Sequence, residues 1–241
     1  ESVSFGYSSS VPLFNDLNIE IPFGSSIGMV GDTGSGKTTI AKLLLRLYEP
    51  SSGDIFMGKH SISDLKLKFL RSKIGIVSQE SFLFNASILD NITYGIKDPR
   101  KEDIEKTIKQ SQCKEFIEKL PQGVDTIVGE RGQNLSGGQR QRISIARTLI
   151  RNPEIIIFDE ATSSVDNKTE QLIQKAIFEI TREKTSIIIA HRLSTIRNCD
   201  NILVLDKGQI IEQGDHDHLT NDQNSYYSKL WKIQTGTLFT D

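Results

Sequence analysis

Long apolar runs and an excess of charge of one sign are both missing from this 241-residue sequence. No apolar run approaches the roughly 20 residues that a membrane-spanning helix needs, and the longest, such as residues 155–158, suit buried strands instead. The net charge is −2, from 29 basic and 31 acidic residues, which argues against a strongly basic nucleic-acid binder. We therefore expect no nucleic-acid partner, although a local positive pocket is compatible with this balance.

Cysteine is also scarce. Cys113 and Cys199 lie far apart and form no CxxC pair, so we expect small buried or half-buried thiols in a reducing compartment. No signal-peptide pattern opens the chain, and we expect a cytosolic location. With 37% hydrophobic and 25% charged residues, the composition is that of a folded protein, and the length predicts one or two domains.

The remaining pattern predicts an α/β fold. Strand candidates alternate with helical stretches, which is typical of a parallel sheet. We expect strands at residues 3–7, 17–21, 27–30, 75–78, 154–158, 186–190 and 202–205, and a hairpin turn at 207–209. Helices are expected at 40–47, 102–108, 140–150 and 169–180. Strand-like runs vanish between residues 86 and 151, which we interpret as a helical insertion.

A phosphate-binding loop follows the strand expected at 27–30. Residues 31–38 fit the pattern G-x-x-x-x-G-K-[ST] and open a helix. The glycines let backbone N–H groups surround a polyphosphate, and the helix N-terminus favours negative charge. Lys37 supplies a positive charge to the β- and γ-phosphates, and the Thr38 hydroxyl can ligate Mg²⁺. The nucleotide-binding residues predicted here are Gly31, Asp32, Thr33, Gly34, Ser35, Gly36, Lys37, Thr38 and Thr39.

Two carboxylates end the strand expected at 154–158. Ligands of a parallel sheet bind at the carboxyl ends of its strands. Asp159 can therefore hold Mg²⁺, and Glu160, which points differently, can polarise an attacking water.

A second anion site is predicted around Ser136, 23 residues before Asp159, in the run Leu-Ser-Gly-Gly-Gln. Ser136 is typical of a helix N-cap, and the glycines after it suit a helix start better than a helix interior. The exposed N–H groups, the Ser136 hydroxyl and the helix dipole all favour a phosphate.

These motifs together resemble the nucleotide-binding domain of ABC transporters, for which LSGGQ is the signature. The resemblance covers nearly the whole chain. It implies a RecA-like parallel-sheet ATPase core with an N-terminal antiparallel β subdomain, formed by residues 1–85 and 152–241. An inserted α-helical subdomain at 86–151 would carry the signature. The implied ligands are ATP and Mg²⁺, with the nucleotide also contacted by Ser136, Gly137, Gly138 and Gln139.

The same resemblance assigns roles that the residues alone would not. Tyr7 would stack on adenine, Gln79 would contact Mg²⁺ and the attacking water, and His191 would contact the γ-phosphate. Residues 163–166 match the loop that touches the opposite protomer. The predicted catalytic residues are therefore Glu160, His191 and Gln79, and the predicted metal ligands are Thr38, Gln79 and Asp159.

Finer features at residues 82–85, 88–92 and 126–132 are similar to exporters. Exporters of this family usually carry the domain after a six-helix membrane domain. We therefore expect an excised C-terminal domain from the cytoplasmic face of a membrane. The acidic, histidine-rich residues 215–218 depart from the family pattern, and we expect them to be solvated polar residues before a helix rather than metal ligands.

The resemblance also implies partners. Two copies would meet head to tail as a homodimer, with each ATP between the phosphate loop of one chain and the signature of the other. The membrane domain would be the second partner. An importer subunit, a soluble ABC ATPase and a non-hydrolytic regulatory module remain as alternatives.

Overall fold

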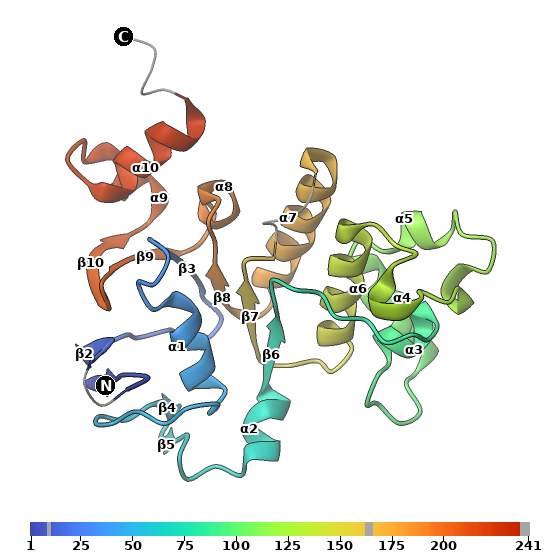
Figure 1. The fold of residues 1–241 in the computed structure, drawn as a ribbon, viewed down its shortest axis with the longest axis horizontal. Coiled ribbons are helices and arrows are strands. Elements are labelled where there is room, and N and C mark those ends of the chain that lie inside the picture. Colours follow the sequence, from blue (N-terminus) through green and yellow to red (C-terminus); the bar gives the residue numbers. More distant parts are fainter. Residues whose placement is uncertain (9–10, 162–165, 237–241) are drawn as a thin grey trace.

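The computed structural model of the chain describes residues 1–8, 11–161 and 166–236, and it confirms an α/β fold (Figure 1). A six-stranded sheet forms the centre, in the order β10-β9-β3-β8-β7-β6. Neighbouring strands are parallel, except that β10 pairs antiparallel with β9 across the predicted hairpin turn. The strands are β3 (Ser26–Gly31), β6 (Ile74–Val77), β7 (Ile155–Asp159), β8 (Thr185–Ile189), β9 (Asn201–Asp206) and β10 (Gln209–Gly214).

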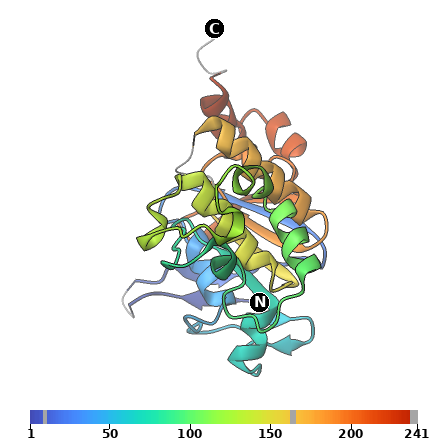
Figure 2. The same cartoon turned by 90° about the vertical axis from the view of Figure 1, so that its right-hand side faces the viewer.

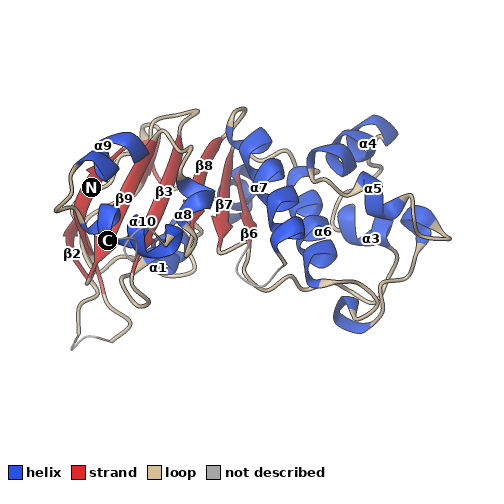
Figure 3. Cartoon of the chain, turned by 90° about the horizontal axis from the view of Figure 1, so that it is seen from above, coloured by secondary structure: helices blue, strands red, loops and turns tan. Residues whose placement is uncertain are grey.

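Helices cover both faces of this sheet. Successive side chains of a strand point to opposite faces, so alternate residues enter different cores. Ile157 belongs to the core that includes α1, whereas Ile156 and Phe158 belong to the core that includes α6, α7 and α8. Figure 3 shows helices on both sides of the strands. The helices around the sheet are α1 (Lys37–Leu44), α2 (Leu67–Lys73), α6 (Gly137–Leu149), α7 (Asn167–Thr181), α8 (Leu193–Ile196), α9 (His216–Asn221) and α10 (Tyr226–Thr235).

Residues 86–151 form helices and short turns, with no strand among them. They include α3 (Ile88–Ile92), α4 (Lys101–Gln110), α5 (Lys114–Ile117) and two 3₁₀ turns, Gly123–Asp125 and Glu130–Gly132. A separate apolar core joins α3 and α5 to one side of α6. Figure 3 shows α3, α4 and α5 beyond the β6 edge of the sheet.

Small antiparallel pairs lie near the N-terminus: β1 (Val3–Phe5) with β2 (Phe14–Leu17), and β4 (Phe56–Met57) with β5 (His60–Ser61). The strand expected at residues 17–21 is wrong, because β2 ends at Leu17. Ser2 has a φ of +53° and donates its N–H to Asn18 Oδ1, so β1 offers no partner beyond Val3. The alternation that suggested a strand comes from Ile19 and Ile21, which still pack against the core.

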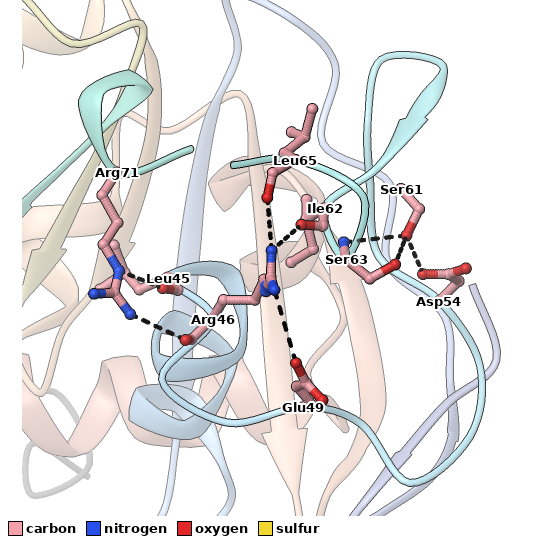
Figure 4. Close-up of polar contacts among 9 residues, drawn as sticks. All are labelled: Leu45, Arg46, Glu49, Asp54, Ser61, Ile62, Ser63, Leu65 and Arg71. Atoms are coloured by element: carbon pink, nitrogen blue, oxygen red, sulfur yellow. Dashed lines mark hydrogen bonds and ion pairs between the residues drawn. The ribbon is translucent and has the colours of Figure 1, made fainter. Parts of the chain in front are cut away.

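Two arginines connect the C-terminus of α1 with α2 and the segment before it (Figure 4). Arg71, on α2, donates from Nε to the carbonyl of Leu45 at 3.1 Å and from Nη2 to the carbonyl of Arg46 at 3.1 Å. Arg46 donates to the carbonyls of Ile62 and Leu65 at 2.9 and 2.8 Å. The last carbonyls of a helix have no partner within it and need such donors. The helix that begins at the phosphate loop is thereby tied to α2, which leads directly into β6.

Both cysteines are free and buried, as predicted. Within the described ranges, every helix is too short or too polar to cross a bilayer. Figures 1 and 2 both place α10 at one end of the molecule and α2 at the other.

Candidate functional site

The predicted phosphate loop runs from the last residue of β3 into the first turn of α1, so residues 31–39 form one continuous segment. Gly34 and Gly36 have φ values of +87° and +108°, which residues with a side chain rarely adopt. A Cβ at Gly36 would also overlap the ring of Phe14. The glycine pattern is therefore required both by the loop's backbone and by its packing.

Lys37 folds back over this loop. Its Nζ donates to the carbonyl oxygens of Gly31 and Asp32 at 2.7 and 2.9 Å, and lies 3.4 Å from Ser35 Oγ. The side chain is buried, and burial lowers the pKa of the Lys37 ammonium against the opposing effect of Glu160 and other nearby carboxylates. A phosphate in the loop would replace neutral carbonyls with a charged partner, which is a stronger interaction for a buried ammonium.

Thr38 and Asp159 meet at the carboxyl end of the sheet. Thr38 Oγ1 donates to Asp159 Oδ1 at 3.1 Å. Burial raises the pKa of the Asp159 carboxyl, and the nearby Glu160 raises it further, while the Thr38 hydrogen bond opposes both. A hydroxyl and a carboxylate held together are oxygen donors of the kind that Mg²⁺ prefers, so these residues fit that ion.

Glu160 faces a different partner from its neighbour. Its Oε1 lies 2.7 Å from His191 Nε2. The two residues approach because β7 and β8 are paired with Asp159 opposite Ile189, so both strands end at the same edge. Glu160 has a φ of +52° and donates its N–H to the Ile189 carbonyl at 2.9 Å, which turns the chain as it leaves the strand.

The structure places two further predicted residues around this edge. Gln79 is exposed and lies just past β6, whose Val77 is opposite Phe158 on β7, so it follows the strand beside the one that carries Asp159. Tyr7 is 53% exposed, and its hydroxyl hydrogen bonds Thr39 Oγ1 at 3.0 Å. Its ring is therefore next to the first turn of α1.

The second predicted anion site begins α6, as expected. Ser136 is the N-cap: its Oγ accepts from Gln139 N at 3.2 Å, while Gln139 Oε1 accepts from Ser136 N at 2.8 Å. This capping box leaves the Ser136 hydroxyl proton available for an anion. Among the described residues, no hydrogen bond or ion pair joins residues 136–139 to 31–39. Figures 1 and 3 show α6 beyond the β6 edge, away from α1.

Two sequence expectations need comment. Residues 163–165 of the predicted protomer-contacting loop lie outside the described residues, whereas Asp166 is the N-cap of α7 and accepts from Thr169 N at 3.0 Å.

The expectation of solvated residues at 215–218 is wrong for His216. Its ring is buried against Tyr227 and Trp231, because the α9 helix turns this position toward α10. Among the described residues no group of three or more histidines, cysteines and carboxylates could hold a metal ion.

Several contacts to the site could not be found from sequence patterns. Tyr226 Oη donates to Asp32 Oδ1, and Gln234 contacts the backbone on both sides of Arg192. Arg192 itself pairs with Glu170, which is buried on α7. These residues belong to no local motif, and only the arrangement of α7 and α10 brings them to the site.

Comparison with known proteins gives a family and several relatives of this chain. The ABC transporter family model matches residues 14–163. The mitochondrial iron-sulfur clusters transporter ATM1 of Candida albicans is 47% identical over 97% of this chain and 32% of that protein. ATP-binding cassette sub-family B member 10, mitochondrial, of Mus musculus is 46% identical over 97% of this chain and 33% of that protein. The uncharacterized ABC transporter ATP-binding protein YwjA of Bacillus subtilis is 45% identical over 98% of this chain and 41% of that protein.

A solved structure of a bacterial Atm1-family ABC exporter with ATP bound is also similar. It matches with a TM-score of 0.91 and 43% identity, over 98% of this chain and 41% of that chain. The chain thus spans less than half the length of each of these relatives.

Proposed function

Because the chain belongs to the ABC transporter family, as an ATPase domain with a RecA-like core, we propose that it is the motor that drives export through a membrane domain. The observation that carries the proposal is the meeting of Lys37, Thr38, Asp159, Glu160 and His191 at one edge of the sheet. A buried ammonium, a hydroxyl–carboxylate pair and a glutamate–histidine pair are the groups that nucleotide hydrolysis needs there.

The phosphate loop would hold the nucleotide. Backbone N–H groups of residues 31–39 and the α1 N-terminus would bind the phosphates, and Lys37 would move from its own loop carbonyls to the β- and γ-phosphates. Tyr7 would stack on the adenine. Mg²⁺ held by Thr38, Asp159 and Gln79 would neutralise phosphate charge as it develops.

Glu160 would orient the attacking water and accept its proton, because its carboxylate lies at the strand end but is not engaged by Thr38. His191 would contact the γ-phosphate while its Nε2 stays near Glu160. Gln79, just past the neighbouring strand, would help to position the same water.

Two chains would close around two ATP molecules, head to tail. The separation of Ser136–Gln139 from the phosphate loop within one chain supports this arrangement, because no hydrogen bond or ion pair joins them among the described residues and α6 lies away from α1 (Figure 3). The Ser136 hydroxyl and the N-terminus of α6 would bind the γ-phosphate held by the partner. We propose the helical residues 86–151 as the subdomain that carries this surface, and a homodimer with two working sites.

The membrane domain of the same transporter is the other proposed partner, which would place this domain at the cytoplasmic face of a membrane. The relatives that match nearly all of this chain are transporters by name, among them an iron-sulfur clusters transporter, and the solved relative is an exporter with ATP bound. Closing and opening of the ATP-bound dimer of two chains would then drive export through the membrane domain.

Glu160→Gln tests the proposal. The variant should lose ATP hydrolysis by at least about 100-fold, because an amide cannot accept the proton. It should elute as a dimer in MgATP on size exclusion, while wild type hydrolyses ATP and elutes mostly as a monomer. Glu20→Gln, at an exposed position, is the matched control and should behave as wild type in both measurements.

Hydrolysis by Glu160→Gln at the wild-type rate would show that Glu160 is not the base, and the proposed mechanism would fail. Binding of MgATP by wild type without any hydrolysis, in the presence of its membrane domain, would instead favour a regulatory module.

A further inference from the structure

The helix α10 contacts both loops of the proposed ATPase site. At its first residue, Tyr226 Oη donates to Asp32 Oδ1 of the phosphate loop at 2.8 Å. Near its end, Gln234 Nε2 donates to the carbonyl oxygen of His191 at 2.7 Å, and Gln234 Oε1 accepts from the backbone N–H of Leu193 at 2.9 Å. One helix therefore touches the segment that would bind phosphate and the segment that carries His191.

The beginning of α10 is firmly attached to the rest of the chain. The carboxylate of Glu212, on β10, accepts the backbone N–H groups of both Tyr226 and Tyr227. Tyr227 is fully buried, and its hydroxyl lies 2.9 Å from His216 Nδ1. Figure 1 shows α10 against α9, above the end of the sheet where β10 lies. Gln234 is thus presented by a helix that is fixed to the sheet.

The His191 ring depends on its backbone for orientation. The side chain is 45% exposed, and within the described part of the chain Glu160 is the only group that pairs with a ring nitrogen. Gln234 hydrogen-bonds to the backbone of His191 and of Leu193, on either side of Arg192. A carboxamide can do this because it carries a donor and an acceptor in one plane.

Arg192, in the same loop, has a contact that does not involve Gln234. Arg192 pairs with Glu170, which is 6% exposed on α7. Glu170 Oε1 also accepts from Gln174 Nε2 at 2.9 Å. Loss of the Gln234 side chain should therefore free the backbone at His191 and Leu193 without releasing Arg192.

We propose that Gln234 is a positioning residue for His191, which sets the histidine against Glu160 and the γ-phosphate through the backbone. The role rests on the proposed ATPase function. It predicts a lower kcat for ATP hydrolysis with little change in ADP affinity, because ADP has no γ-phosphate for His191 to contact.

The test compares Gln234→Ala with wild type, His191→Ala and the double variant. We expect kcat of Gln234→Ala to fall about tenfold, as for the loss of two side-chain hydrogen bonds, with ADP affinity within about twofold. In the His191→Ala background the second change should have almost no effect, because residues that act through one another are not additive. A merely structural residue would lower the rate equally in both backgrounds.

Two further measurements do not depend on hydrolysis. Amide hydrogen exchange at Leu193 should be faster in Gln234→Ala, because its acceptor is gone, while Gln234→Glu keeps the acceptor and should protect this amide. Trp231, the single tryptophan, packs against His216 of α9, so unchanged emission shows that the helix stays docked. Lys229→Ala, exposed on the same helix, is the control and should match wild type.

The proposal is overturned if Leu193 exchange is unchanged, or if Gln234→Ala lowers kcat equally with and without His191. Full activity of Gln234→Ala, where His191→Ala is strongly impaired, also overturns it and leaves the proposed function standing. The proposed function fails by a different result, which is hydrolysis by Glu160→Gln at the wild-type rate.

Discussion

Asp159 and Glu160 are neighbours in the sequence, yet their carboxylates meet different partners. Asp159 accepts from Thr38, whereas Glu160 lies against His191. The left-handed backbone at Glu160 separates the two directions. Both charges nevertheless stay close to one another, and burial together with Glu160 raises the pKa of the Asp159 carboxyl.

The raised pKa of Asp159 predicts that Asp159→Asn stabilises the chain when nucleotide and Mg²⁺ are absent. A carboxyl with a raised pKa contributes most stability below its unfolded pKa, and that contribution is lost as pH rises through the folded pKa. At pH 7 the ionised wild type bears this penalty and the neutral amide does not. We expect the variant to melt a few degrees higher at pH 7, by thermal unfolding.

The difference in melting temperature should shrink as the pH falls from 7 toward 4, since wild-type Asp159 becomes protonated. A difference that stays constant over this range would show that the gain has another cause. Asp64→Asn, at an exposed position, should show almost no difference at any pH.

At the scale of elements, α6 connects the sheet to the helical residues 86–151. Ile145 and Leu149 enter the core on the sheet, while Ile143 and Ala146 enter the helical core. The N-terminus of α6 also approaches α7 closely, because a Cβ at Gly138 would overlap the γ-methyl of Thr169. The second glycine of the signature is therefore required by helix packing as well as by any ligand.

This packing predicts that Gly138→Ala destabilises the chain. The expected loss in the free energy of unfolding is about 1–3 kcal/mol, typical of overpacking, although alanine is the better helix former. Adding Thr169→Ser removes the overlapping methyl and keeps the hydroxyl, so it should restore most of the stability. Urea unfolding of the two single variants and the double variant measures this. Equal loss in Gly138→Ala with and without Thr169→Ser would contradict the packing explanation.

At the scale of the whole molecule, the described residues form three apolar cores. Two lie on opposite faces of the sheet and share its strands. The third lies within the helical residues and shares only α6 with one of the others. Cys113 is buried in this helical core, and Cys199 in a core on the sheet, so each thiol reports on a different part.

Labelling of the two thiols can report the order in which the helical core and the core on the sheet open. Burial raises the pKa of each thiol to about 12, so both should resist iodoacetamide in the folded chain. In increasing urea we expect Cys113 to be labelled first, because the smaller helical core has less buried apolar surface to hold it closed. Peptide mass spectrometry gives the extent of labelling at each cysteine. Labelling of both at the same urea concentration would mean that the chain opens as one unit.

Much of the fold and part of the site could be predicted from local patterns. The helix expected at 169–180 is α7, and the apolar runs before Asp159 and before residue 31 are central strands. The strand expected at 17–21 was wrong because the antiparallel partner strand β1 begins only at Val3, opposite Leu17. Gln234 was missed because a glutamine near the end of a helix has no pattern that marks it.

Local patterns in the sequence were enough to locate the loop at 31–39, the cap at Ser136 and the carboxylates that end β7. Such features depend on backbone conformation and on neighbours within about one helical turn. The folded chain was needed to show that Glu160 meets His191, that Gln234 hydrogen-bonds to the backbone beside it, and that Tyr226 reaches Asp32 across 194 positions. These contacts depend on the path of the chain across the sheet, which no local pattern specifies.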